Sequence, residues 1–101
     1  KIDIAVIDIS LIPLENILPS VKRIIKEEGA VVVLFKPQYQ TRDPKILRHG
    51  IVINDAEREK LLHNFTVWAK DTGWDIIRQM ESPIKGGEGN TEFLLHMKQK
   101  L

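Results

Sequence analysis

Cysteine is absent from the 101 residues of this chain, so it can form neither a disulfide nor a thiolate metal site. This absence fits a reducing compartment, and we expect a cytoplasmic protein. Long hydrophobic runs are also absent, because every apolar run is far shorter than the ~20 residues that a membrane-spanning helix needs. An excess of charge of one sign is missing too, since the net charge is +1. The composition therefore argues against a membrane protein and does not by itself require a nucleic-acid partner.

The chain does have the composition of a globular domain, with 43% hydrophobic and 29% charged residues. At this length it is one domain at most. No signal peptide or initiator methionine precedes the first predicted strand, which begins almost at Lys1. We therefore expect a piece of a longer protein, although a processed or trimmed chain would look the same.

Two apolar runs predict the first two strands, over residues 3–9 and 30–36. Both runs lack the alternation of a half-exposed strand, so we expect buried parallel strands. The helical segment between them, within 14–28, is predicted to kink or restart at Pro19, because proline disrupts a helix interior. Gly29 is predicted to follow the end of this helix. Together these elements predict a βαβ unit with a right-handed crossover.

The second half of the chain predicts a capped helix followed by two strands. Asn54 with Glu57 three residues later is an N-cap signature, and Gly73 marks the end of the helix. Strands are predicted at 74–81 and 91–98, and the short glycine-rich connection between them favours an antiparallel pair. The apolar stripe of the helix is interpreted as core: Leu61, Leu62, Phe65, Trp68 and Ala69.

Three charged residues lie at the ends of apolar runs: Asp8, Lys36 and Glu92. In an open α/β sheet, the ligand crevice lies outside the carboxyl ends of the strands, where Asp8 and Lys36 are expected. Singly, Asp8 could cap a helix and Lys36 could be a solvated strand end. Pro37 confines Lys36 to an extended conformation, which aims its side chain. An acid and an amine that converge on one crevice can carry out acid–base chemistry.

Residues 37–54 predict a long loop with a local basic patch, because lysine and arginine outnumber the single acid Asp43 within 36–49. An ordinary solvated loop is the alternative. The glycine-rich segment 82–90 is either a tight turn or a loop whose backbone approaches a ligand or an RNA phosphate. No metal site is expected, because the three histidines are not at ligand spacing: His49, His63 and His96.

Three strings in the chain resemble the TlyA (hemolysin A) family of FtsJ-like ribosomal-RNA 2′-O-methyltransferases. They are Val6-Ile7-Asp8-Ile9-Ser10, then Lys36-Pro37-Gln38-Tyr39, then the segment from Ser82 to Leu94. They resemble the family strings "VxDVSF", "KPQFE" and "SPIxGxxGNxEFL" in order and spacing. One departure is Gln40-Thr41, where the family often has a glutamate and a glycine.

The resemblance implies an α/β, Rossmann-like S-adenosylmethionine-dependent methyltransferase fold, here its C-terminal half, a mostly parallel sheet ending in an antiparallel pair. Residues 1–101 would then be part of an FtsJ-like domain without its donor-binding half and its S4 domain, and inactive alone. It also implies a catalytic Lys-Asp-Lys-Glu tetrad, in which Asp8, Lys36 and Glu92 are the last three members. A second lysine nearby, or a desolvated site, makes a lysine amine a usable base.

The resemblance further implies contacts to the methyl donor and to ribosomal RNA. Asp8 and Ile9 would contact S-adenosylmethionine. Six residues would contact the RNA: Lys36, Gln38, Arg42, Lys45, Arg48 and Lys85. The alternative function is a noncatalytic RNA-binding or interaction remnant that keeps a hemolysin name. A pore-forming cytolysin is disfavoured, because no segment is long or amphipathic enough. We also expect the first strand to be open on one side, so that the chain could self-associate through it.

Overall fold

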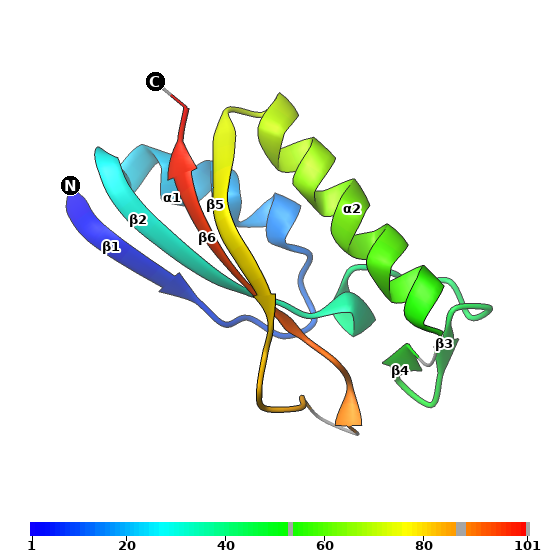
Figure 1. Cartoon of the computed structure of the whole chain (residues 1–101). Coiled ribbons are helices and arrows are strands. Elements are labelled where there is room, and N and C mark those ends of the chain that lie inside the picture. The colour runs from blue at the N-terminus through cyan, green and yellow to red at the C-terminus, as the bar shows by residue number, and fades with distance from the viewer. Residues whose placement is uncertain (53, 87–88, 101) are drawn as a thin grey trace.

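The computed structural model describes residues 1–52, 54–86 and 89–100 as a four-stranded sheet with two α-helices and a small separate hairpin (Figure 1). The sheet has the strand order β1-β2-β6-β5. Its strands are β1 (Ile2–Ile7), β2 (Ile25–Phe35), β5 (Trp74–Glu81) and β6 (Phe93–Gln99). The helices are α1 (Leu18–Ile24) and α2 (Asp55–Asp71), with the 3-10 turns η1 (Leu14–Asn16) and η2 (Pro37–Tyr39). The hairpin is β3 (Leu47–Arg48) with β4 (Ile51–Val52).

The four predicted strands are confirmed, with the first pair parallel and the last pair antiparallel. Strand β6 lies between β2 and β5 and is antiparallel to both, so β1, β2 and β5 run in one direction and β6 in the other. Most strands of the described sheet therefore run in one direction, as predicted, but most neighbouring strands pair in the antiparallel way. Of the three pairings in the described sheet, one is parallel.

The boundary between α1 and β2 differs from the prediction. Pro19 lies in the first turn of α1, which confirms a helix restart there. The helix ends at Ile24, however, and the chain is already extended at Ile25, so the helix predicted as far as residue 28 is wrong. Gly29 is a buried residue of β2 and not a helix cap. A Cβ at Gly29 would lie 2.6 Å from Cγ1 of Ile25, so close packing requires the glycine.

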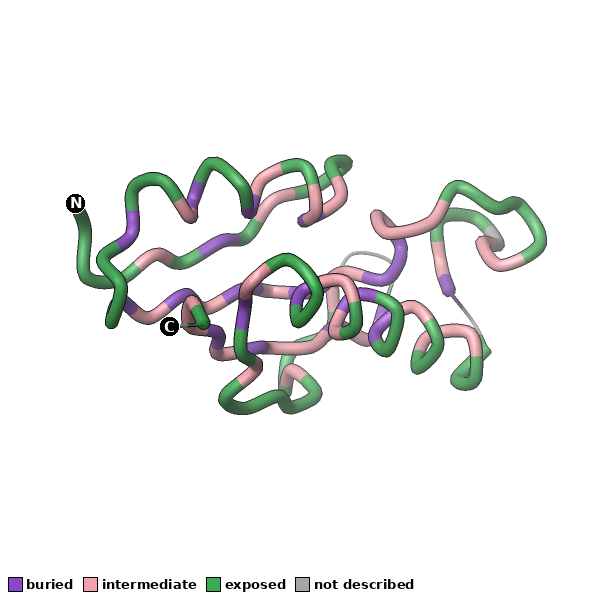
Figure 2. Tube along the Cα trace, turned by 90° about the horizontal axis from the view of Figure 1, so that it is seen from above, coloured by how far each residue is buried: buried purple, intermediate pink, exposed green. Residues whose placement is uncertain are grey.

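The hydrophobic core lies on one face of the sheet, beneath both helices. Leu18 of α1 and Phe65 of α2 belong to the same buried cluster as Val33 of β2 and Leu95 of β6. Figure 2 shows buried positions recurring along the helices with exposed positions between them. The predicted stripe of α2 is confirmed: Leu62, Phe65 and Ala69 are buried, and Leu61 and Trp68 pack against the cluster.

The predicted ends of α2 are confirmed as well. The Oδ1 atom of Asn54 accepts a hydrogen bond from the backbone N–H of Glu57 at 3.1 Å, which is an N-cap. Gly73 follows the helix with a φ of +95°. This left-handed conformation favours glycine and turns the chain into β5.

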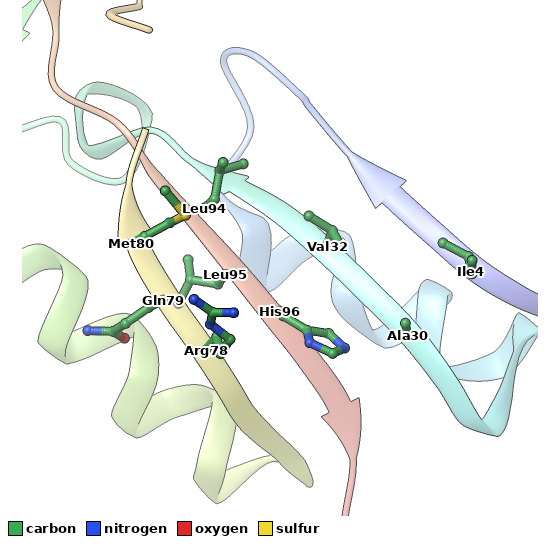
Figure 3. A pocket seen from close by; sticks show the side chains of 9 residues that line it. All are labelled: Ile4, Ala30, Val32, Arg78, Gln79, Met80, Leu94, Leu95 and His96. Carbon is green, nitrogen blue, oxygen red and sulfur yellow. The ribbon is translucent and has the colours of Figure 1, made fainter. Parts of the chain in front are cut away.

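No helix within the described residues covers the opposite face of the sheet. Ile4 and Val6 of β1 are 64% and 74% exposed there. Figure 3 shows Ile4, Val32 and Leu94 on this face, one from each of three strands, among the residues that line one pocket. The prediction of a buried first strand is therefore wrong for β1, which forms an edge of the sheet. None of the described helices is both long and apolar enough to cross a membrane.

Candidate active site at the carboxyl ends of β1 and β2

Asp8 and Lys36 meet at one end of the sheet because each follows a strand of the same parallel pair. Asp8 comes directly after β1, and Lys36 comes directly after β2. The Nζ atom of Lys36 lies 2.6 Å from Oδ1 of Asp8. The side chain of Lys36 is 14% exposed and that of Asp8 is 61% exposed, so one side of the ion pair is open to solvent.

Two further groups surround the amine of Lys36. Its Nζ atom donates a hydrogen bond to Oγ of Ser10 at 3.3 Å and lies 6.0 Å from the centre of the Tyr39 ring. The backbone of Lys36 is extended, with φ −112° and ψ 97°, as Pro37 predicts. The amine is therefore held by a carboxylate, a hydroxyl and an aromatic ring.

Glu92 lies at the same end of the sheet. The last described pair between β2 and β6 is Phe35 with Phe93, and the next residue beyond it on each strand is Lys36 and Glu92. Glu92 is only 4% exposed. Its Oε2 atom accepts a hydrogen bond from Nε2 of Gln38 at 2.7 Å. The structure thus shows a direct contact between Asp8 and Lys36, whereas Glu92 is bonded to Gln38.

The glycine-rich segment passes close to this buried carboxylate. A Cβ on Gly86 would lie 1.9 Å from Oε2 of Glu92, so a side chain at this position would force the carboxylate of Glu92 to move. Gly89 has a φ of +82°, which matches the tight-turn interpretation. Gly87 and Glu88, which belong to the same string, lie outside the described residues.

The segment predicted as a loop contains a hairpin that the sequence did not reveal. His49 and Gly50 both have positive φ, 51° and 78°, as a two-residue hairpin turn of type I′ requires. The buried side chain of Asn90 holds this hairpin to the glycine-rich segment. Its Oδ1 atom accepts from the N–H of Val52 at 3.0 Å, and its Nδ2 atom donates to the carbonyl of Gly50 at 2.9 Å.

The residues predicted to contact RNA differ in their surroundings. Arg42 and Lys45 are exposed on the segment before the hairpin. Lys85 is half exposed and donates to Oγ1 of Thr91 at 2.9 Å. Lys36 is mostly enclosed, and Gln38 is 8% exposed with its amide bonded to Glu92. The side chain of Arg48 lies outside the described part of the structure.

The two residues predicted to contact the methyl donor lie side by side after β1. Asp8 is exposed and paired with Lys36, whereas Ile9 is partly buried and packs against the core. Within the described residues, no group of three or more histidine, aspartate or glutamate side chains could hold a metal ion.

Sequence reasoning named Gln38 only as an RNA contact and assigned no role to Asn90, so it missed how these two polar residues organise the site. Both are buried and both bridge segments far apart in the chain. Their signal in the sequence is that each lies two residues from Lys36 or Glu92, within a string that resembles the family. This signal places the two residues near the site, but it does not show which groups their side chains bind.

No family model matches the chain. Hemolysin A of Brachyspira hyodysenteriae is 33% identical over 93 residues, which are 92% of this chain and 39% of that protein. The 23S rRNA (cytidine-2′-O)-methyltransferase TlyA of Campylobacter jejuni is 29% identical over 97 residues, 95% of this chain and 38% of that protein. The resemblance to the TlyA/hemolysin A family is confirmed.

The TlyA/hemolysin A likeness extends to three dimensions. A solved structure described as a "putative hemolysin" from Streptococcus thermophilus matches with a TM-score of 0.91 and 39% sequence identity. The match covers 97% of this chain and 35% of that one. This chain therefore spans between a third and two fifths of the length of these TlyA/hemolysin A relatives.

Proposed function

We propose that this chain is the carboxyl-terminal half of the catalytic domain of a ribosomal-RNA 2′-O-methyltransferase that uses S-adenosylmethionine. The contact between Asp8 and Lys36 at the sheet end carries the proposal. The name of the Campylobacter relative supports the reaction, a methyl transfer to the ribose of cytidine. An RNA-modifying role would also place the protein in the cytoplasm.

The architecture fits half of a Rossmann-like domain, residues 1–101, whose other half binds the donor. The site lies at the carboxyl ends of β1 and β2, where open α/β sheets bind their ligands. One sheet face carries both helices and the other is open. The relatives contain more than twice as much chain, which could supply the missing layer, the donor loop, the first lysine of the tetrad and an S4 domain.

Methyl transfer to a ribose hydroxyl requires a base that removes the hydroxyl proton, and an amine can serve as that base. The amine of Lys36 would accept the proton as the 2′-oxygen becomes methylated. Asp8 fixes the amine in place, and Glu92 would orient the hydroxyl and hold a neighbouring cation. Because the methyl group moves in line from donor to oxygen, positioning supplies much of the rate and no metal is needed.

The donor supplies an electrophilic methyl group carried on a sulfonium. The exposed carboxylate of Asp8 is suited to lie beside such a positive charge. Ile9, partly buried next to it, offers an apolar surface for the donor. These two residues therefore fit the edge of a donor site, and sequence outside this segment would complete it.

The RNA would be held by the exposed basic residues that flank the site, Arg42, Lys45 and Lys85, with Arg48 on the hairpin. Phosphate contacts of this kind position an RNA without reading its sequence. Lys36 would contact the RNA as the base, at the ribose. Gln38 is bonded to Glu92, so a different role is argued for it below.

A chimera tests the proposal, in which this chain replaces the matching segment of the Campylobacter jejuni TlyA protein. The chimera should transfer methyl groups to 23S rRNA. Lys36→Ala should slow transfer by about a hundred- to ten-thousandfold, with RNA and donor affinity retained, because the base acts in the transition state. As a control, Lys45→Ala should weaken RNA binding and leave the rate at saturating RNA unchanged. A cooperatively folded chimera without transfer, or full activity of Lys36→Ala, would contradict the assignment.

The second candidate is a noncatalytic RNA-binding or interaction module. The exposed basic residues beside the hairpin favour it, since they serve RNA binding without any chemistry. The same chimera separates the two functions. RNA binding by a folded chimera that never methylates RNA at any donor concentration would favour the module.

A further inference from the structure

The amide of Gln38 is the direct neighbour of the Glu92 carboxylate. Its Nε2 atom lies 2.7 Å from Oε2, in a bond that joins residues 54 positions apart. Both side chains are buried, at 8% and 4% exposure. Because an N–H bonded to a carboxylate makes a stronger bond than a neutral pair, Gln38 can fix the orientation of Glu92.

The direction of this amide is set by its partner. Turning the amide over would place Oε1 of Gln38 against the carboxylate, and two acceptors cannot form a hydrogen bond. In the observed direction, Oε1 is buried and has no hydrogen-bond partner in the described structure. A buried acceptor without a partner destabilises a fold, so stability alone does not explain this amide.

Gly86 forms the other wall around the carboxylate. A Cβ there would lie 1.9 Å from Oε2 and 2.4 Å from Cδ of Glu92. The backbone of Gly86 is itself held, because its N–H donates to the carbonyl of Asn90 at 2.8 Å and its carbonyl accepts from Gly89 at 3.0 Å. The carboxylate of Glu92 therefore lies in a slot between an amide and a fixed stretch of backbone.

The turn η2 connects this slot to the ion pair. Lys36 precedes Pro37 and Gln38 on one short turn, which is closed by a hydrogen bond from the N–H of Tyr39 to the carbonyl of Lys36 at 2.9 Å. One end of the turn carries the amine bonded to Asp8, and its middle carries the amide bonded to Glu92. The turn thus sets the positions of the amine and the buried carboxylate together.

We propose that Gln38 is a positioning residue for methyl transfer, which holds Glu92 against the wall formed by Gly86. This role rests on the proposed function and deepens it. Gln38 acts on the reaction through Glu92 and does not contact the RNA. The exact position of the Glu92 carboxylate matters for the rate, since a shift of about 1 Å in a catalytic group can slow a reaction by about a hundredfold.

The rate test uses Gln38→Met in the active chimera, because methionine keeps the length of glutamine and loses the donor. We expect kcat to fall by about a hundredfold with KM for RNA unchanged. In a Glu92→Ala background, Gln38→Met should cause no further loss, because its effect passes through Glu92. Gln79→Met, at an exposed glutamine, is the matched control and should leave both constants unchanged.

Two outcomes of this test would overturn the proposal. A raised KM for RNA with unchanged kcat would make Gln38 an RNA contact. An equal loss in both backgrounds would show that Gln38 acts independently of Glu92. If Gln38→Met does not fold, Gly86→Ala provides the same test, since its added Cβ would displace the carboxylate of Glu92 and its effect should also disappear in Glu92→Ala.

A measurement without catalysis separates this inference from the proposed function. In the glutamine-labelled chain, the side-chain amide protons of Gln38 should exchange with solvent at least tenfold more slowly than those of Gln79, and Glu92→Ala should abolish the difference. Equal exchange rates in an active chimera would overturn the role of Gln38 alone. A folded chimera that never transfers methyl groups would overturn the proposed function and this role with it.

Discussion

The two faces of the sheet are built from similar residues but have different surroundings. On β2, Val31, Val33 and Phe35 face the helices and are fully buried, while the intervening Val32 and Leu34 lie on the open face and are half-buried. An apolar run without alternation is typical of a strand covered on both faces. The chain therefore carries a sheet face that is suited to burial and that its own helices leave uncovered. Stability comes from one face, and the other is available for association.

The largest expected effect is a loss of stability caused by a substitution in the core, on the face of the sheet that the helices cover. The centre of the Phe65 ring lies 5.2 Å from the centre of the Phe35 ring and 5.9 Å from that of the Trp68 ring. Phe65→Ala therefore removes a side chain that is packed among other aromatic rings of the core. We expect a loss of about 3–5 kcal/mol in the free energy of unfolding. Denaturant unfolding monitored by circular dichroism measures it. Val67→Ala, at an exposed position of the same helix, should cost less than about 0.5 kcal/mol; similar losses for both would contradict the assigned core.

The second prediction concerns the open face. We expect the isolated chain to self-associate through β1 and the exposed apolar residues around it, because an unpaired strand edge beside an apolar patch favours association. Replacing Ile4 and Val6 by lysine should shift the chain to a monomer, as measured by light scattering. Ile84→Lys, at an equally exposed apolar residue outside the strands, should leave the association unchanged. A wild-type chain that is monomeric at all accessible concentrations would show that the open face does not drive association.

The third prediction tests how the site is attached to the sheet. Asn90→Ala should leave the N–H of Val52 and the carbonyl of Gly50 without their bonds to Asn90, at a cost of about 1–3 kcal/mol. Amide exchange at Val52 should accelerate at least tenfold, while exchange at Val33 in the sheet should follow global stability only. Thr41→Ala, in the same region, is the control. Unchanged exchange at Val52 would mean that Asn90 does not hold the hairpin.

The smallest expected effect concerns the end of α2. Asn54→Ala removes the cap bond to Glu57 and should lower stability by about 1 kcal/mol. Thermal unfolding measures the loss. Asn64→Ala, an exposed position in the helix interior, should be neutral or slightly stabilising because alanine has the higher helix propensity. A loss at Asn64 as large as that at Asn54 would show that the cap is not the cause.

Local signals predicted the elements with strong patterns. The cap at Asn54, the stripe through Phe65 and the glycine after the helix defined α2 because they depend on neighbours within a turn or two. The prediction of secondary structure failed where pairing with a distant segment determines the backbone conformation. Residues 25–28 have helix-compatible side chains, but pairing between Ile25 and Ile2 draws them into β2. Local propensity cannot anticipate such a pairing.

The candidate site shows the same division. The contact between Asp8 and Lys36 could be predicted from the sequence, because each residue follows a strand of a predicted parallel pair. The carboxyl ends of parallel strands lie at the same edge of a sheet. The partner of Glu92 could not be predicted in this way. Gln38 and Glu92 are brought together by a turn after one strand and the start of another, and the sequence between them does not constrain their distance.

The sequence by itself thus determined the four strands of the sheet, the long helix and the acid–amine pair, because apolar periodicity and strand direction suffice for these features. The tertiary structure alone decided that β6 lies between β2 and β5, that one sheet face stays open and that Glu92 is enclosed by Gln38 and Gly86. The physical reason is that each of these depends on contacts between segments far apart in the chain. Those contacts are fixed by how whole elements pack, and no local pattern encodes them.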